Sequence, residues 1–380
     1  MSVSRRANAV PPFIVMDVMR EAAEKEARNE SVIHLEVGQP STPAPSGALE
    51  AAREALSRDR LGYVDALGIP KLRERISRHY RERYGIEVPA DRVIVTTGSS
   101  NGFLLAFLGA FDAGARVAMA APGYPPYRNI LSALGLTPVD LVTTATERYQ
   151  PTVSQLEKAG ALNGVIVASP SNPTGTMVTR AELAALYGHC RTHGLTLISD
   201  EIYHGLTFGE RATSALEIGD DAIVVNSFSK YFSMTGWRVG WLVVPPALVR
   251  PIERLAQNLM ISTPTISQFA ALGAFECTEE LEGHVRRYRA NRDLLMAGLP
   301  RAGLDRLTVA TGAFYTYADI SHLTNDSVEF CRRMLREAGV ATTPGVDFDP
   351  QRGRGTLRIS FAGSTAEMEE AVKRLVAWKR

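Results

Sequence analysis

Short apolar segments alternate with longer amphipathic segments along most of this chain, and this alternation limits its fold more than any other feature. The short segments are rich in valine, isoleucine and leucine, have the length of β-strands, and cover residues 93–96, 117–119, 165–167, 195–198 and 222–225. Strands that are apolar on both faces are typical of parallel sheets buried between two layers of helices. The pattern therefore predicts an α/β fold with a three-layer large domain, in which helices cover a mostly parallel sheet.

The segments between these strands have apolar residues at helical spacing and recognisable helix ends. In residues 45–56, alanine and leucine recur every three or four positions, and Ser46 is the predicted N-cap. Residues 179–182, Thr-Arg-Ala-Glu, form a predicted capping box for another helix, and Gly194 is its predicted end. The alternation of helices and strands extends over about residues 45–275, which we assign to one domain.

The pattern changes in the last quarter of the chain. It consists there of helical segments at 279–296 and 327–337, strand-like segments at 313–317 and 356–361, and a last helix to residue 380. This order predicts a second, smaller α+β domain, and a chain of 380 residues is longer than one core usually supports. We therefore predict an N-terminal segment (1–44) that contributes to the small domain, a large domain (45–277) and a C-terminal small domain (278–380).

Composition and charge argue against several classes of function. The formal net charge is +1 and basic residues are scattered, so we expect neither nucleic acid nor a membrane as a partner. No stretch approaches about 18 uninterrupted apolar residues, and residues 1–13 lack the apolar region of a signal peptide. Cys190, Cys277 and Cys331 are far apart and have no metal-ligand spacing, so we predict no disulfide framework, no metal and a cytoplasmic protein.

Polar residues directly follow four of the predicted strands. They are Gly98-Ser99-Ser100, the segment 169–175 with Asn172, the pair Asp200 and Tyr203, and the pair Ser227 and Lys230. In open parallel sheets, ligands bind outside the carboxyl ends of the strands. We therefore expect all four groups at one edge of the sheet, where they would form a single site.

Each of these groups also has an ordinary structural explanation when it is taken alone. Gly-Ser-Ser is usually a loop or a helix cap, and Asn172 has the character of a turn residue. A strand-end carboxylate such as Asp200 often bonds to backbone, and Tyr203 could be a half-buried aromatic residue. Most lysines keep their amine in water, which would make Lys230 a surface residue.

Taken together, the groups meet the requirements of pyridoxal 5'-phosphate (PLP), which we predict as the cofactor. PLP chemistry uses a lysine that forms a Schiff base and a carboxylate that keeps the pyridine nitrogen protonated. A helix N-terminus and an arginine suit the phosphate, while phenol and amide groups suit the ring hydroxyl. A low-dielectric pocket with nearby cations would lower the pKa of Lys230, so that its amine can act as nucleophile and proton carrier.

The same residues lie in motifs that resemble those of the class I PLP-dependent aminotransferases, a family of fold type I. The resemblance extends over almost the whole chain. Its motifs here are Ser227-Phe228-Ser229-Lys230, Gly236-Trp237-Arg238-Val239-Gly240, Ser171-Asn172-Pro173-Thr174-Gly175, Asp200-Glu201-Ile202-Tyr203, Tyr63 with Gly68, Leu72 and Arg73, and Arg358 in Leu357-Arg358-Ile359-Ser360-Phe361.

The resemblance implies a role for each residue at the cofactor. Lys230 would form the internal aldimine, and Asp200 would pair with the pyridine nitrogen. Asn172 and Tyr203 would bond to the ring hydroxyl, and Tyr124 would stack on the ring. The implied catalytic residues are Lys230, Asp200 and Tyr203, and the implied phosphate ligands are Gly98, Ser99, Ser100, Ser227 and Arg238.

The resemblance also implies contacts with the substrate and between subunits. Arg358 would grip the substrate α-carboxylate as a bidentate fork, with Asn172 and Gly38 beside the substrate. Tyr63 would reach the phosphate in the neighbouring subunit, so a homodimer with shared active sites is implied. Gln39 stands where family members often have an acid, which leaves the local contacts there open.

The implied reaction is the transfer of an amino group from an L-amino acid to a 2-oxo acid, through pyridoxamine phosphate. The same fold hosts C–S β-lyases and other α-carbon chemistries, so a lyase is the alternative. A regulatory protein on this fold would usually carry an added DNA-binding domain, for which the N-terminal segment is short. The amino-acid donor stays open, because Phe13, Tyr124 and Tyr127 could line an apolar pocket or could simply pack.

Overall fold

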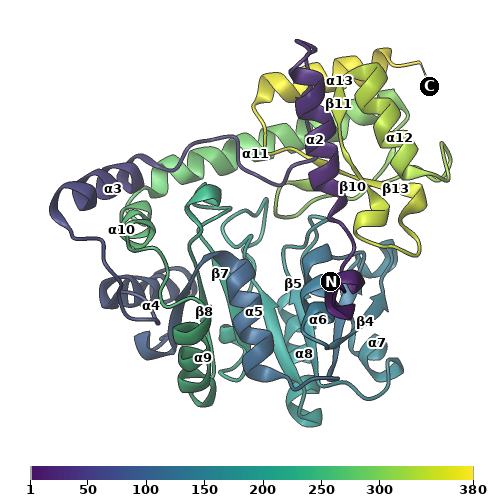
Figure 1. The fold of residues 1–380 in the computed structure, drawn as a ribbon. Helices are drawn as coiled ribbons and strands as arrows, with labels where there is room; N and C mark the ends of the chain where they lie inside the picture. The colour runs from purple at the N-terminus through teal and green to yellow at the C-terminus, as the bar shows by residue number, and fades with distance from the viewer. Residues whose placement is uncertain (1, 380) are drawn as a thin grey trace.

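The computed structural model describes residues 2–379, apart from the side chain of Arg5. Its main element is a seven-stranded sheet of order β2-β8-β7-β6-β5-β3-β4 (Figure 1). Strand β8 is antiparallel to both its neighbours, and the other neighbouring pairs are parallel, as predicted. The strands are β2 (Val93–Thr96), β3 (Arg116–Ala121), β4 (Thr137–Val142), β5 (Gly164–Ala168), β6 (Thr196–Asp200), β7 (Ile223–Ser227) and β8 (Gly240–Val243).

Helices cover both faces of this sheet. Alternate residues of its strands point to opposite faces, and they belong to two separate core clusters. Ile94 and Ile166 pack with residues of α5, α6 and α9, whereas Val95 and Val165 pack with residues of α4, α7 and α8. This arrangement confirms the predicted three-layer α/β fold. The helices are α3 (Ser46–Arg58), α4 (Pro70–Tyr84), α5 (Gly98–Ala110), α6 (Pro125–Ala133), α7 (Val153–Lys158), α8 (Arg180–His193), α9 (Pro246–Leu259) and α10 (Thr265–Ala274).

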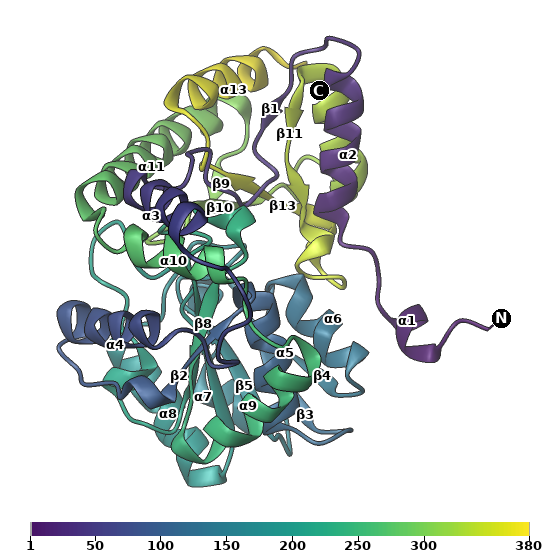
Figure 2. The same ribbon diagram turned by 60° about the vertical axis from the view of Figure 1, so that its left-hand side comes forward.

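Both ends of the chain build the second, smaller unit (Figure 2). Strand β1 (Ile33–His34) pairs in parallel with β11 (Val340–Ala341), and Val18 and Ala22 of α2 pack against Leu335. A second sheet has the order β12-β13-β10-β9 and is antiparallel. Its strands and the helices of this unit are β9 (Arg306–Leu307), β10 (Tyr315–Asp319), β12 (Thr343–Pro344), β13 (Thr356–Ser360), α2 (Ile14–Glu26), α11 (Thr278–Gly298), α12 (Ser327–Arg333) and α13 (Thr365–Ala377), and a short α1 (Arg5–Ala9) precedes them. The domain boundaries at residues 44 and 277 stay a prediction.

The observed ends of the helices can be compared with the capping residues predicted from the sequence. The Thr179 side chain caps α8 as predicted, and Gly194 ends this helix with a φ of 66°. The prediction of Ser46 as the N-cap of α3 is wrong, because Pro45 occupies that position. The carboxylate of Glu280 accepts hydrogen bonds from the Ser46 N–H (3.0 Å) and hydroxyl (2.8 Å), so a residue of α11 caps α3 instead.

Two further differences concern the C-terminal helices. The helix predicted over 327–337 is α-helical only to Arg333 and continues as a π-helical turn, Met334–Ala338. The last helix, α13, ends at Ala377. Within residues 2–379, no helix combines the length and the apolar character needed to cross a membrane.

Candidate active site

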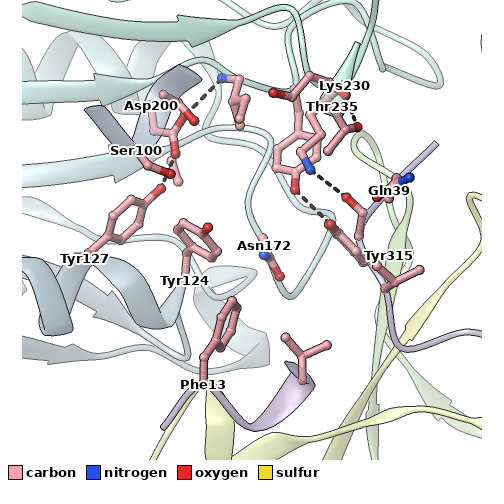
Figure 3. Close-up of a pocket in the computed structure, with 18 of the residues that line it drawn as sticks. Phe13, Gln39, Ser100, Tyr124, Tyr127, Asn172, Asp200, Lys230, Thr235 and Tyr315 are labelled. Carbon is pink, nitrogen blue, oxygen red and sulfur yellow. Dashed lines mark hydrogen bonds between the residues drawn. The ribbon is translucent and has the colours of Figure 1, made fainter. Parts of the chain in front are cut away.

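The predicted strand-end groups meet in one cavity of about 260 Å³ (Figure 3). Gly98 and Ser227 contact residues of its lining, whereas Tyr63 lies elsewhere on the chain. The other predicted site residues line it directly, and they are Gly38, Ser99, Ser100, Tyr124, Asn172, Asp200, Tyr203, Lys230, Arg238 and Arg358. The carboxyl ends of β5, β6 and β7 therefore open on a common site, as expected for parallel strands.

Lys230 follows the end of β7 and directs its amine into this cavity. Its Nζ donates a hydrogen bond to the Gly38 carbonyl at 2.6 Å. Burial, and then the positive charges of Arg358 and Arg238, lower the pKa of Lys230 to about 8. The amine is thus held near the point at which it changes charge, which suits a nucleophile that also carries protons.

Asp200 is the last residue of β6 and is buried. Its Oδ1 accepts a hydrogen bond from the Ile202 N–H at 3.0 Å, and its Oδ2 accepts one from the Tyr127 phenol. Burial raises the pKa of Asp200 to about 6, although both hydrogen bonds and the charge of Lys230 oppose this rise. The carboxylate is therefore ionised near neutral pH, although its buried position disfavours an unpaired negative charge.

The start of α5 and Arg238 form the part of the site suited to an anion. The helix begins at Gly98, so Ser99 and Ser100 belong to its first turn. A Cβ on Gly98 would lie 2.4 Å from Arg238 Nη2, and the φ of 73° at this position also favours glycine. Both serines line the cavity.

Ser227 differs from its predicted neighbours because its hydroxyl is engaged inside the turn. It bonds to the Ser229 hydroxyl at 2.8 Å and donates to the Val239 carbonyl at 3.1 Å. Ser229 and Thr235 line the cavity in its place. A direct phosphate contact for Ser227 stays a prediction.

Arg358 lies on β13 and faces the cavity from the small unit, almost completely buried. Its Nη1 donates to Asn172 Oδ1 at 2.9 Å, and its Nη2 donates to the Glu36 carbonyl and to Thr343 Oγ1. The centroid of the Tyr315 ring lies 4.4 Å from the guanidinium carbon, so the ring packs against the guanidinium. The Nε is buried without a partner, so one strong donor is unused in the absence of a ligand.

Tyr315 is a site residue that sequence reasoning missed. Its hydroxyl bonds to the Tyr203 hydroxyl at 2.8 Å, and a Cβ on Gly38 would lie 1.9 Å from it. This close approach explains why position 38 is glycine. Tyr315 falls in the strand predicted over 313–317, but nothing in that segment reveals which of its side chains face the site.

An apolar wall closes the cavity opposite these polar groups, and most of it was also missed. Phe13 points toward Tyr124, with ring centroids 6.2 Å apart (Figure 3). Helix α2 adds Val15, Met16 and Met19. Phe13 and Tyr124 therefore belong to the lining, which was one of the two alternatives left open by the sequence.

The fold, together with a site of this composition at the carboxyl edge of its sheet, is that of a PLP-dependent transferase of fold type I. The chain belongs to the aminotransferases of class I and II, whose family model matches residues 30–375. The valine–pyruvate aminotransferase of Mycobacterium tuberculosis is 51% identical over 374 residues, which cover 97% of this chain and 96% of that protein.

Solved structures lead to the same family. A crystal structure of an aminotransferase from Mycobacterium tuberculosis has a TM-score of 0.97 and 50% identity, covering 100% of this chain and 99% of the other. The aspartate aminotransferase from Thermus thermophilus, solved with maleate, has a TM-score of 0.93 and 31% identity, with 99% of each chain covered. This protein is a PLP-dependent aminotransferase, as predicted, and these relatives give no support to the lyase alternative.

Proposed function

We propose that PLP binds between Lys230 and Asp200, with its phosphate at residues 98–100 and Arg238. The donor set fits this group, because an amine, a carboxylate and an anion-binding helix start border one cavity. The glycine at position 98 lets the Arg238 guanidinium lie against the helix start. When bound, the cofactor supplies an aldehyde carbon that condenses with amines and a ring that accepts electrons.

The observation that carries this proposal is the Lys230 amine, held in the cavity with a pKa of about 8. A fraction of it is neutral near neutral pH, so Nζ would be able to act as the nucleophile that holds the cofactor. Nζ would also be placed to accept the proton from the α-carbon of the donor and to give it back. The Gly38 carbonyl accepts its hydrogen bond and keeps it inside the cavity.

Asp200, Asn172 and Tyr203 orient the cofactor in this proposal. The Asp200 carboxylate lies deep in the site, where a positive ring nitrogen would compensate its buried charge. Asn172 uses its Oδ1 for Arg358 and so presents its amide nitrogen to the ring hydroxyl. The Tyr203 phenol would reach the same hydroxyl, and Tyr124 would stack on the ring.

Arg358 binds the α-carboxylate of the amino acid and of the oxo acid. Its Nη groups already hold Asn172 and the Glu36 carbonyl, so its plane is fixed before the substrate arrives. The planar guanidinium would bind a carboxylate through two parallel hydrogen bonds. Only arginine offers this planar set of donors.

We also propose a homodimer in which Tyr63 completes the site of the partner. Tyr63 is 84% exposed and lies beside an open groove that is also lined by Leu61 and Pro264. Arg238 is exposed as well, so this single chain leaves its anion site uncovered. A second copy that places Tyr63 there would account for both exposures. We propose the cytoplasm as the compartment, in line with three unpaired cysteine thiols.

Valine and pyruvate, from the name of the 51% identical relative, are the first substrates to test. Cofactor-loaded protein mixed with L-valine and pyruvate should form alanine, and valine alone should change the absorbance of the bound cofactor. A protein that takes up no PLP would contradict the proposal. Release of pyruvate and ammonia from a cysteine-type donor without any oxo acid would instead indicate a lyase.

A further inference from the structure

A group of buried polar residues lies next to the cavity without lining it. The group consists of Tyr84 on α4, Ser169 after β5, and Glu201 and His204 after β6. Each of them is at most 9% exposed, and, within residues 2–379, none belongs to the lining of the cavity. Burial of polar groups is costly unless they are paired, so four of them at one place call for a reason. The proposed function gives none of them a task.

His204 joins the two turns that follow β5 and β6. Its Nε2 donates a hydrogen bond to the Ser169 carbonyl at 3.0 Å, and the Ser169 N–H donates to the Asp200 carbonyl at 3.3 Å. Ser169 lies three residues before Asn172, and His204 directly follows Tyr203. The proposed function brings Asn172 and Tyr203 to the same ring hydroxyl of the cofactor. The side chain of His204 is therefore a direct link between the turns that carry them.

The surroundings of the His204 imidazole determine which of its nitrogens carries the hydrogen. A carbonyl oxygen can only accept, so Nε2 is the N–H. Burial lowers the pKa of His204 to about 3, which keeps the ring neutral and leaves Nδ1 as an acceptor. The Tyr84 phenol donates to Nδ1 at 2.8 Å. Both ring nitrogens are thus paired, and the two bonds hold the ring in one orientation.

Glu201 is the completely buried carboxyl group beside His204. Its Oε1 accepts from the Ser199 hydroxyl (3.1 Å), the Ser214 hydroxyl (3.0 Å) and the Ala215 N–H (2.8 Å). Its Oε2 lies 3.5 Å from His204 Nδ1 and, among the described residues, has no hydrogen-bond partner. Burial raises the pKa of Glu201 to about 8, so this group is mostly the uncharged acid at neutral pH. An uncharged acid does not draw a proton onto His204, and Nδ1 remains an acceptor.

We propose that His204 is a positioning residue, which holds the turn of Asn172 and the turn of Tyr203 at the spacing that the ring hydroxyl of the cofactor requires. The inference rests on the proposed function, because that function places the hydroxyl between these two side chains. Hydrogen bonds donated to the ring oxygen favour its ionised form. Looser contacts would therefore weaken cofactor binding and raise the pH at which the absorbance of the bound cofactor changes.

Two substitutions at position 204 separate the roles of the two ring nitrogens. The amide of a glutamine reaches about as far as Nε2, so His204→Gln keeps the bond to the Ser169 carbonyl. The amide of an asparagine reaches only about as far as Nδ1, so His204→Asn keeps the acceptor for Tyr84 and loses the bond to Ser169. Tyr84→Phe is the matched control, because it removes the hydrogen bond on the other side of the ring and leaves the bond to Ser169 in place.

Absorbance follows both the affinity of the cofactor-free protein for PLP and the pH titration of the loaded protein. His204→Asn should lower the affinity about tenfold and raise the pH midpoint by about 0.5–1 pH unit. His204→Gln and Tyr84→Phe should keep an affinity within about threefold of wild type, with an unchanged pH midpoint. The thermal midpoint should fall to a similar extent in His204→Asn and Tyr84→Phe, since each leaves one buried polar group unpaired.

Two results would overturn the inference alone: a pH midpoint in His204→Asn equal to that of wild type, or equal losses of affinity in His204→Asn and Tyr84→Phe. The second result would show that His204 only stabilises the fold. Where His204→Asn does not fold, His204→Gln decides, because an affinity loss of about tenfold with the Ser169 bond retained also contradicts the inference. A wild-type protein that takes up no PLP would overturn the proposed function, and the inference with it.

Discussion

The Tyr127 phenol donates a hydrogen bond to Asp200, the carboxylate at the end of β6. The tyrosine is itself held in place, because its ring packs edge-on against the rings of Phe103 and Tyr124. The ring centroids are 5.1 Å and 5.3 Å away, respectively. The same carboxylate receives the Ile202 N–H on its other oxygen. Both oxygens of Asp200 are thus oriented before any ligand arrives, which reduces the reorganisation needed on cofactor binding.

Loss of this phenol should weaken cofactor binding. Tyr127→Phe removes one charge-assisted hydrogen bond and further raises the pKa of Asp200, so PLP should bind about tenfold more weakly near neutral pH. Absorbance titration of the cofactor-free protein measures this affinity. Tyr80→Phe is the matched control, because this buried phenol accepts from Trp241 and does not line the cavity. Equal affinities for wild type and Tyr127→Phe would refute the expectation.

Replacement of Lys230 should abolish catalysis and leave the fold intact. Lys230→Met removes the nucleophile and proton carrier, so kcat should fall by at least about 10³-fold. After borohydride reduction, mass spectrometry should find the cofactor attached to the wild type and not to the variant. The thermal midpoint of the cofactor-free variant should not fall, since burial disfavours the charged amine. A variant that still binds the cofactor covalently would rule Lys230 out.

Asp200 should make the stability of the cofactor-free protein depend on pH. Its pKa rises on folding from 3.8 to about 6, so between these values the folded form binds more protons than the unfolded chain. The free energy of unfolding therefore falls as pH rises from about 4 to 6. Asp200→Asn should be more stable than wild type by about 1–3 kcal/mol above pH 6, with no difference near pH 4. Denaturant unfolding at several pH values checks this, and a constant difference would contradict it.

Arg358→Lys should damage substrate binding and spare cofactor binding. Lysine keeps the charge but loses the planar donors, including the unused Nε. The KM for both the amino acid and the oxo acid should rise by about 10²-fold, whereas PLP affinity should stay within about twofold of wild type. Steady-state kinetics and cofactor titration separate the two effects. A large loss of PLP affinity would place Arg358 at the cofactor instead.

Mixed dimers should test the role of Tyr63 across subunits. Lys230→Met and Tyr63→Phe are each expected to lose activity as homodimers, the second one partly. If Tyr63 serves the neighbouring subunit, each mixed dimer contains one site with both native residues. Refolding an equal mixture should then raise the activity above the average of the two homodimers. An activity equal to that average would indicate that Tyr63 acts within its own chain, or not at all.

Sequence reasoning found the residues whose placement depends on the sheet itself. Asp200 and Lys230 directly follow strands of strongly apolar composition, and parallel strands bring such positions together whatever the details of packing. The lining that includes Asn172 and Ser99 follows for the same reason. Sequence reasoning could not find contacts set by packing between distant segments. The Arg358–Asn172 and Tyr203–Tyr315 pairs depend on how β13 and β10, which pair with each other, pack against the segments that follow the strands of the large sheet.

The wrong N-cap has the same origin. Ser46 has the right side chain for a cap, but Glu280 of α11 reaches its N–H from another part of the chain. The role of α2 was also hidden, because Met16 and Met19 look like ordinary core residues at helical spacing. Only the fold shows that the apolar side of α2 contributes both to the small unit and to the cavity.

Because β1 pairs with β11, the small unit needs both ends of the chain. Cofactor binding and substrate binding therefore depend on segments that are made at different times. Within one chain, the groups proposed to hold the cofactor, from Gly98 to Arg238, come from one continuous stretch of the sequence. The lining groups outside this stretch come from the two ends, with Phe13 near the start and Arg358 near the finish. A nascent chain therefore contains these cofactor-binding residues well before it contains Arg358. It acquires selectivity only when synthesis is nearly complete.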